Sequence, residues 1–128
     1  MIDLKGISKI YGQKKVVNDV SVSIAKGKVT SFIGPNGAGK STLLSMITRL
    51  LDQDSGEVLL EGKNILQAPS DTLAKKIAIL KQSNHMDLKI TVRELISFGR
   101  FPYSKGRLNE RDHEIIDEAI SYMELEEY

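Results

Sequence analysis

The sequence predicts a mixed α/β domain, and three features of the chain carry that prediction. A glycine-rich run with a lysine, Gly34–Thr42, stands between a β-branched stretch and a helical pattern. Apolar residues alternate before this run, which predicts strands because successive strand side chains point to opposite faces. Apolar residues three and four positions apart follow it, which indicates helices with one apolar face. Strands come first, then the glycine loop and a helix, then a further strand and helices, and this mixture predicts a mixed α/β domain.

The part of the chain before the glycine run predicts three strands. Ile2–Ile10 alternates loosely and predicts a strand that bends near Gly6. Residues 11–15 form a polar turn, and Val16–Ile24 then repeats with period two. Lys28–Ile33 is rich in β-branched and aromatic residues and predicts a strand that leads into the glycine run.

Elements of both kinds follow the glycine run. Ser41–Leu51 predicts a helix, Asp52–Gly56 a break, and Glu57–Glu61 a strand. Ser70–Lys76 has the pattern of a short capped helix, and Ile77–Leu80 that of a buried strand. The first helix has an apolar face made of Leu43, Leu44, Ile47, Leu50 and Leu51.

The last third of the chain predicts two helices. Thr91 and Glu94 have the spacing of a capping box, so a helix should run from there to about Phe98. Gly99–Leu108 is predicted as loop because it holds a proline and a glycine. Asn109 is the predicted cap of a second helix, with an apolar face made of Ile115, Ile116, Ala119, Ile120 and Met123.

Composition sets few limits on function. A length of 128 residues suits one domain, and the net charge of +1 indicates no general affinity for nucleic acid. The absence of cysteine excludes disulfides and thiolate metal sites. No run has the length of a membrane-spanning helix, and the first residues lack the pattern of a secretory signal. His85 and His113 lie too far apart for metal-ligand spacing, and both are expected at the surface.

The glycine run fits the phosphate-binding pattern G-x-x-x-x-G-K-[ST] at every fixed position. Its glycines allow a tight curve that turns backbone N–H groups inward, toward phosphate oxygens. Lys40 supplies a positive charge for the outer phosphates, and the Ser41 hydroxyl suits Mg²⁺. A chance glycine turn is the alternative, but the flanking strand and helix patterns oppose it. The predicted phosphate-contacting residues are Gly34, Asn36, Gly37, Ala38, Gly39, Lys40, Ser41 and Thr42.

The chain resembles the first half of an ABC transporter ATPase, the nucleotide-binding subunit of a membrane transporter. The form of the phosphate loop, Tyr11-Gly12, Asp54-Ser-Gly56 and Gln82 carry the resemblance. It implies an α/β P-loop NTPase fold of the ABC type, truncated before the C-terminal half. Such a fold would hold an N-terminal antiparallel β subdomain, a partial parallel core sheet and the start of a helical subdomain. The β subdomain and P-loop core would span residues 1 to about 84. The helical subdomain would span residues from about 85 to 128.

The resemblance also implies roles for single residues around ATP and Mg²⁺. Tyr11 would stack on adenine, although an aromatic residue there could instead pack against the sheet. Val16 would line the same pocket or belong to the core. Lys40 and Gln82 would act in catalysis, and Ser41 and Gln82 would bind Mg²⁺.

A narrower resemblance concerns the last third of the chain. Gly99–Tyr103, Arg107-Leu108, Asp112 and Ala119 look like the helical subdomain of importer ATPases for iron–siderophore complexes, haem and vitamin B12. This favours an iron(III)–siderophore importer. The resemblance implies a cytoplasmic protein, peripheral on the inner face of the cell membrane, with a second ATPase subunit. A membrane permease would contact the Gln82 region and residues 99–108, with Arg100 and Tyr103 as candidates; an ordinary polar loop is the alternative.

The printed residues hold no Leu-Ser-Gly-Gly-Gln-type signature, no apolar strand ending in Asp-Glu and no later switch histidine. These segments complete hydrolysis in the family, so we expect weakened nucleotide binding and little or no hydrolysis by residues 1–128 alone. A non-catalytic nucleotide-binding module or a truncated product is the alternative function. Action on DNA or ribosomes is disfavoured by the near-neutral charge, and a small-molecule kinase or GTPase by the N-terminal strands with Tyr11. Unpaired parallel strands also predict self-association.

Overall fold

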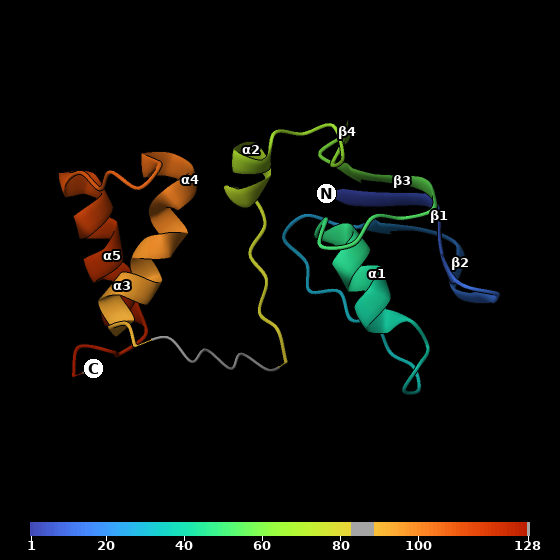
Figure 1. Ribbon diagram of the computed structural model, residues 1–128, viewed down its shortest axis with the longest axis horizontal. Coiled ribbons are helices and arrows are strands. Elements are labelled where there is room, and N and C mark those ends of the chain that lie inside the picture. Colours follow the sequence, from blue (N-terminus) through green and yellow to red (C-terminus); the bar gives the residue numbers. More distant parts are fainter. Residues whose placement is uncertain (83–88, 128) are drawn as a thin grey trace. The chain divides into compact units, whose positions relative to one another are not determined.

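A computed structural model describes residues 1–82 and 89–127, and its contacts divide the chain into two units, Met1–Pro69 and Ser70–Tyr128. The first unit holds a sheet with one helix, and the second holds only helices among its described residues (Figure 1). The predicted boundary near residue 84 lies outside the described residues and stays a prediction.

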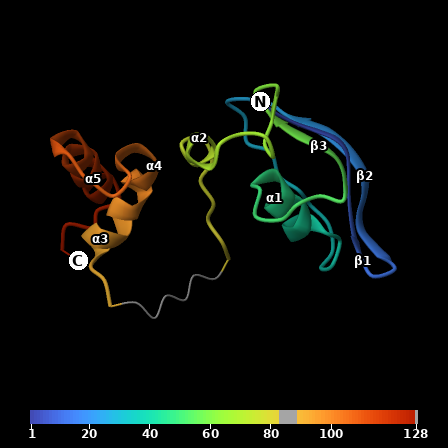
Figure 2. The ribbon, with the colours of Figure 1, turned by 45° about the horizontal axis from the view of Figure 1, so that its top comes forward.

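The sheet of the first unit is antiparallel throughout, with strand order β2-β1-β3-β4. Its strands are β1 (Ile2–Tyr11), β2 (Lys14–Ile24), β3 (Ser55–Leu60) and β4 (Lys63–Asn64). The long strands β1 and β2 form a hairpin, which is curved in Figure 2. The strands predicted over 2–10, 16–24 and 57–61 are therefore confirmed, each with bounds shifted by at most two residues.

The predicted bend near Gly6 is confirmed as an irregularity of β1. Its register with β2 shifts between Leu4 and Ile7, and Gly6 has φ +58°, a conformation that favours glycine. The Ser21 hydroxyl accepts the Gly6 N–H at 2.8 Å, which replaces a ladder bond. Gly56 of β3 approaches the same bend, since a Cβ there would lie 2.4 Å from the Gly6 carbonyl oxygen.

Helix α1 (Lys40–Ile47) packs its apolar face against the sheet. The buried side chains of this core are Leu4, Ile7, Val17, Leu43, Met46, Ile47, Val58 and Ile65. The helix was predicted to reach Leu51, and it stops four residues earlier. Leu44 and Leu50 of its predicted apolar face are about half exposed.

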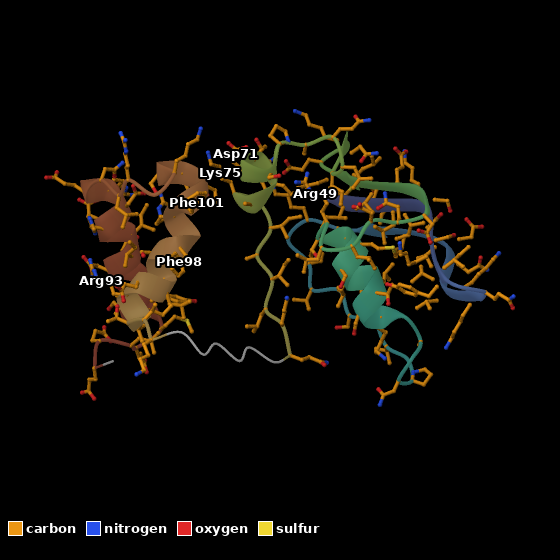
Figure 3. The ribbon with its side chains drawn as sticks, viewed as in Figure 1. Arg49, Asp71, Lys75, Arg93, Phe98 and Phe101 are labelled. Carbon is orange, nitrogen blue, oxygen red and sulfur yellow. The ribbon has the colours of Figure 1, made fainter. Side chains whose placement is uncertain are left out.

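A Schellman motif ends α1. Arg49 adopts φ +57°, the Leu50 N–H donates to the Ser45 carbonyl at 2.9 Å, and the Arg49 N–H donates to that of Met46 at 3.2 Å. The Arg49 guanidinium, labelled in Figure 3, donates to the carbonyls of Ile65 at 2.9 Å and Ala68 at 2.6 Å. Because glycine is the usual residue in this conformation, the sequence pattern did not mark the end.

Two predicted strands are wrong. Lys28–Ile33 and Ile77–Leu80 are irregular, and neither belongs to the sheet. Val29, Ile33 and Leu80 are more than 90% exposed, which is the opposite of a buried strand. A parallel strand is held by hydrogen bonds to its neighbours, and no described strand pairs with either segment. The predicted partial parallel sheet is therefore absent from residues 1–82 and 89–127.

The second unit consists of short helices and one longer one. They are α2 (Ser70–Ala74), α3 (Val92–Ser97), the 3₁₀ helix η1 (Phe98–Arg100), α4 (Phe101–Ser104) and α5 (Glu110–Tyr122). Helices α3 and α5 contact each other, as do α2 and α4. Leu73, Asp112 and Ile116 are its buried side chains among the described residues.

The two helix starts predicted in the last third of the chain are confirmed. Thr91 caps α3 in a capping box, with the Thr91 N–H donating to a Glu94 carboxylate oxygen at 2.7 Å. Asn109 caps α5 in the same way, with Asp112 in the place of Glu94. Of the predicted apolar face of α5, Ile116 is buried, whereas Met123 lies beyond the helix and is 63% exposed.

The loop predicted over Gly99–Leu108 is wrong over its first half, because η1 and α4 continue directly from α3. Pro102 does not end the helical conformation, because it lies in the first turn of α4, where a missing N–H costs no helical hydrogen bond. Lys105, with φ +51°, ends α4. Helix α2 ends at Ala74, two residues before the predicted end.

Candidate functional site

The glycine run forms a tight loop in front of α1. Gly37 and Gly39 have φ of +82° and +86°, which side chains of L residues rarely permit. A Cβ at Gly39 would also lie 2.5 Å from the carbonyl oxygen of Val16, so the loop touches the backbone of β2. Gly34 is different, because its φ is ordinary and its nearest neighbour would be the Ala38 side chain at 3.5 Å. Within the glycine run, the structure therefore requires glycine most strictly at position 39.

The N-terminus of α1 is open to an anion. Gly39 is its N-cap, no side chain accepts a capping hydrogen bond there, and the first turn carries no acidic residue. The first N–H groups of a helix have no partner within the helix, and its dipole places partial positive charge at that end. The helix thus presents donors and positive charge where the motif needs them.

Lys40 adds a full positive charge at the same place. Its ammonium donates to the carbonyl oxygens of Gly34 and Pro35, each at 2.8 Å. The lysine therefore folds back over the loop that precedes it. An incoming phosphate would replace these carbonyls as the partner of the ammonium, because a charged acceptor makes the stronger hydrogen bond.

A cavity of about 360 Å³ lies between β2, the segment before the glycine loop, and α1. Its size is within the range of small-molecule pockets. The residues that line it are mostly apolar, with Lys40 as the charged one, and include Val16, Asn18, Phe32, Ala38, Gly39 and Leu43. Val16 thus lies beside the glycine loop through both its side chain and its carbonyl.

Tyr11 lies at the end of β1, where it pairs with Lys14 of β2. Its side chain is 51% exposed, and the ammonium of Lys9 lies over its ring, 5.8 Å from the centroid. In Figures 1 and 2 the β1–β2 turn and the loop before α1 lie toward the same end of the first unit. The exposed half of the ring is therefore available to a planar group.

Asp54 fixes the end of β1, a role that the sequence did not reveal. One carboxylate oxygen accepts from the Lys9 ammonium at 2.8 Å, and the other from the Ile10 N–H at 2.7 Å. The hydrogen bond from Lys9, then that from Ile10, holds the pKa of Asp54 below its usual value. The only sequence signal is the motif Asp54-Ser-Gly56, which by itself indicates no function for Asp54.

The two predicted metal ligands, Ser41 and Gln82, belong to different units. Ser41 is exposed in the first turn of α1, and its hydroxyl is an oxygen ligand of the kind that Mg²⁺ takes together with phosphate oxygens. Gln82 is exposed at a bend of the second unit. Within the described part of the chain, no group of three or more acidic or histidine side chains could hold a metal by itself. A site shared by Ser41 and Gln82 stays a prediction.

The prediction that Arg100 is an exposed loop residue is wrong. Arg100 belongs to η1, and its Nε donates at 2.7 Å to Asp112, whose side chain is only 3% exposed. The second Asp112 oxygen accepts the Asn109 N–H at 3.1 Å. These hydrogen bonds, that from Asn109 first, lower the pKa of Asp112. Arg100 therefore ties η1 to the start of α5.

Aromatic side chains around Arg100 are exposed instead. Tyr103 is 49% exposed and lies under the Arg100 guanidinium, 4.0 Å from its ring centroid, and under the Lys75 ammonium at 5.0 Å. Phe98 and Phe101, labelled in Figure 3, are 60% and 62% exposed. We call these three residues the aromatic surface. Tyr103 was predicted as a contact residue and Phe101 lies in the predicted contact range 99–108, whereas Phe98, at the end of the predicted helix, was not predicted as a contact residue.

Known proteins match most of this chain. The profile of the family described as ABC transporter matches residues 17–128. The Petrobactin import ATP-binding protein YclP of Bacillus subtilis (strain 168) is 54% identical over 99% of the chain and 50% of its own length. The Iron(3+)-hydroxamate import ATP-binding protein FhuC of the same strain is 43% identical over 92% and 45%, respectively. The Hemin import ATP-binding protein HmuV of Pseudomonas entomophila (strain L48) is 32% identical over 94% and 47%. The chain spans about half the length of these relatives.

A solved structure confirms the predicted fold class. The protein titled "Structure of ATP binding subunit of ABC transporter" superposes with a TM-score of 0.80 at 24% identity. The match covers 98% of this chain and 51% of that one. No described helix of this chain is both long and apolar enough to cross a membrane.

Proposed function

The chain belongs to the ABC transporter family, and from this premise we propose that it is part of an importer's ATP-binding subunit. In this proposal, residues 34–42 bind the phosphates of ATP, and the bound nucleotide powers uptake of an iron(III)–siderophore complex. The observation that carries the proposal is the phosphate loop itself. Its Gly39 conformation, the uncapped start of α1 and the Lys40 ammonium bring donors and positive charge to one place.

Binding of the phosphates begins with an exchange of partners at Lys40. The ammonium leaves the Gly34 and Pro35 carbonyls and donates to phosphate oxygens, while N–H groups of the loop and of α1 contact the same anion. The Ser41 hydroxyl would hold Mg²⁺, which neutralises phosphate charge when bound. Gln82 is the second proposed metal ligand.

The base and ribose would lie toward β1 and β2. Tyr11 offers an exposed ring at the strand end, and base stacking needs only a flat face of this kind. Val16 lines the cavity next to Gly39, which supports its proposed place in the nucleotide pocket.

The proposed substrate class follows from the relatives. The relatives at 54% and 43% identity are named for import of petrobactin and of iron(3+)-hydroxamate, and the one at 32% for import of hemin. The higher identities thus belong to the proteins named for petrobactin and for iron(3+)-hydroxamate, which supports the iron(III)–siderophore class for this chain.

The proposed partners are a membrane permease and a second ATPase subunit, with no nucleic acid. The aromatic surface supports a permease contact within residues 99–108, because exposed aromatic side chains are favoured at protein interfaces. The Gln82 region is the other proposed contact. Such an assembly places the chain in the cytoplasm, peripheral on the inner face of the cell membrane.

A second candidate is a nucleotide-binding module without catalysis. The cavity-lining residues include no carboxylate, whereas hydrolysis needs a group that orients the attacking water. We therefore expect residues 1–128 to bind MgATP and to hydrolyse it slowly or not at all. ATP turnover at an ordinary enzymatic rate that Lys40→Ala abolishes would contradict this.

The proposed ATP site is tested by calorimetric titration of the chain with MgATP. Lys40→Ala should weaken binding at least about tenfold, because a charge-assisted hydrogen bond to phosphate is lost. The matched control is Lys26→Ala, which removes an equal charge from an exposed turn of the same unit and should leave the affinity unchanged. Equal affinities of wild type and Lys40→Ala would refute the proposed site.

A further inference from the structure

The last residues of β1 are held by a loop and not by a strand. Pairing of β1 with β3 reaches Ser8, which faces Ser55, and stops there. Beyond Ser8, Asp54 makes hydrogen bonds to β1 in place of a strand. Its N–H donates to the Ser8 carbonyl at 2.9 Å, and its carboxylate accepts the Ile10 N–H at 2.7 Å. The side chain thus supplies the acceptor that a neighbouring strand would have offered.

Asp54 also fixes the side chain of Lys9. The ammonium donates to the Asp54 carboxylate and to the Asp52 carbonyl, both at 2.8 Å. The Lys9 side chain is only 13% exposed, so its charge is held in place and does not move freely in solvent. The same ammonium lies 5.8 Å from the centroid of the Tyr11 ring.

These contacts converge on Tyr11. Asp54 binds Lys9 and Ile10, the two residues directly before Tyr11. The Lys9 ammonium lies over one face of the Tyr11 ring. Half of the tyrosine surface stays exposed. A cation above an aromatic ring restrains its orientation and leaves its other face for stacking.

The restrained ring is linked to the phosphate loop through β2. Tyr11 pairs with Lys14, and the carbonyl of Val16, two residues further along, contacts Gly39. Two residues of strand span about 7 Å. A shift at the end of β1 would therefore change the distance between a stacked base and bound phosphates.

We propose that Asp54 is a positioning residue of the nucleotide site, which holds Tyr11 where its ring stacks on the base. The inference rests on the proposed function, because it needs a nucleotide bound at the phosphate loop. It adds a residue with no contact to phosphate or metal, whose removal weakens recognition of the base alone.

The test compares two ligands that share the phosphates. The affinities of the chain for MgATP and for magnesium tripolyphosphate, which has no base, are measured by calorimetry. Asp54→Asn should weaken ATP binding roughly three- to tenfold, the usual range for a lost aromatic stack, and change tripolyphosphate binding less than about twofold. Tyr11→Ala should do the same, and the double variant should bind ATP no more weakly than Tyr11→Ala.

Glu57→Gln is the matched control. Glu57 joins β3 to β1 through an ion pair with Lys5 at 3.4 Å, as Asp54 does through Lys9, and has no contact with Tyr11. It should leave both affinities unchanged. If Asp54→Asn lowers the content of folded protein in circular dichroism, Lys9→Met carries the same prediction through the other half of the contact.

The outcomes separate this role from the proposed function. Equal weakening of both ligands by Asp54→Asn would show general loosening of the unit and overturn the positioning role, as would no change in either. A wild-type chain that binds neither ligand would overturn the proposed function and this role together. A wild type that binds both, with a loss restricted to ATP in the variant, supports both.

Discussion

At Gly39 two independent constraints meet, and only the structure reveals the second. The sequence motif has a glycine at this position because glycine lets backbone N–H groups approach a phosphate closely. The structure adds a steric reason, since a Cβ at Gly39 would lie 2.5 Å from the Val16 carbonyl oxygen. Gly34, a fixed position of the same motif, has neither a positive φ nor a close neighbour. Positions that look equal in a motif thus differ in what a substitution would cost.

We predict that Gly39→Ala is more harmful than an alanine at another left-handed glycine. Gly62→Ala is the control, because Gly62 has φ +78° and no atom within 4 Å of an added Cβ. The control should lose about 1–2 kcal/mol of stability from backbone strain alone. Gly39→Ala should lose more and should also lose MgATP binding, as measured by urea unfolding and calorimetry. Equal losses of stability in the two variants would contradict the steric argument.

Whether the sequence predicted an element of this chain depended on how far apart in the sequence the residues lie that form its contacts. The capping boxes at Thr91 and Asn109 use partners three residues away; the sequence predicted the first box and, at Asn109, the cap without its partner Asp112. The strands β1 and β2 pair across a tight turn and were also predicted. The end of α1 was missed because a non-glycine residue, Arg49, takes the left-handed conformation. The loop predicted over Gly99–Leu108 was wrong because Pro102 fits a first helical turn as well as it fits a loop.

The start of α5 should make the second unit sensitive to acid. The folded-state pKa of Asp112 is lowered by the Asn109 N–H and by Arg100, so its stabilising effect is present above the unfolded pKa of about 3.8. That effect is lost as the pH falls through the lower folded-state value. We expect the thermal midpoint to fall as the pH drops below about 4, and Asp112→Asn to reduce this dependence.

The acid dependence is measured by circular dichroism melts between about pH 2 and pH 7. Glu110→Gln is the control, since Glu110 is exposed in the first turn of the same helix. It should keep the steep acid dependence of the wild type. An Asp112→Asn variant with an unchanged pH profile would contradict the role given to this carboxylate.

At the scale of the whole molecule, three apolar side chains are the most exposed large hydrophobic ones within residues 1–82 and 89–127. Val29 is 97% exposed, Ile33 95% and Leu80 91%, all in the two segments that were predicted as strands. Their composition is that of buried strands, but no described strand pairs with them. Extended apolar segments without partners are sites of association between chains.

We therefore predict that the chain associates with itself as its concentration rises. Val29→Lys combined with Leu80→Lys should shift the sedimentation coefficient in analytical ultracentrifugation toward that of a monomer. Gln13→Lys with Gln67→Lys is the control, because it adds the same charge at exposed polar positions. A wild type that stays monomeric at every concentration, or a control that disperses it equally well, would contradict this.

The sequence by itself determined the features that depend on near neighbours: the glycine loop before a helix, the hairpin strands with a bend at Gly6, the capping box at Thr91 and the helix cap at Asn109. Their hydrogen bonds or backbone angles are set within a few residues or across one tight turn, so a pattern can encode them. Only the tertiary structure decided what Asp54, Arg100 and the segment Lys28–Ile33 do. Asp54 finds Lys9 and Arg100 finds Asp112 through the fold, and a strand pattern becomes a strand only where another strand accepts its hydrogen bonds.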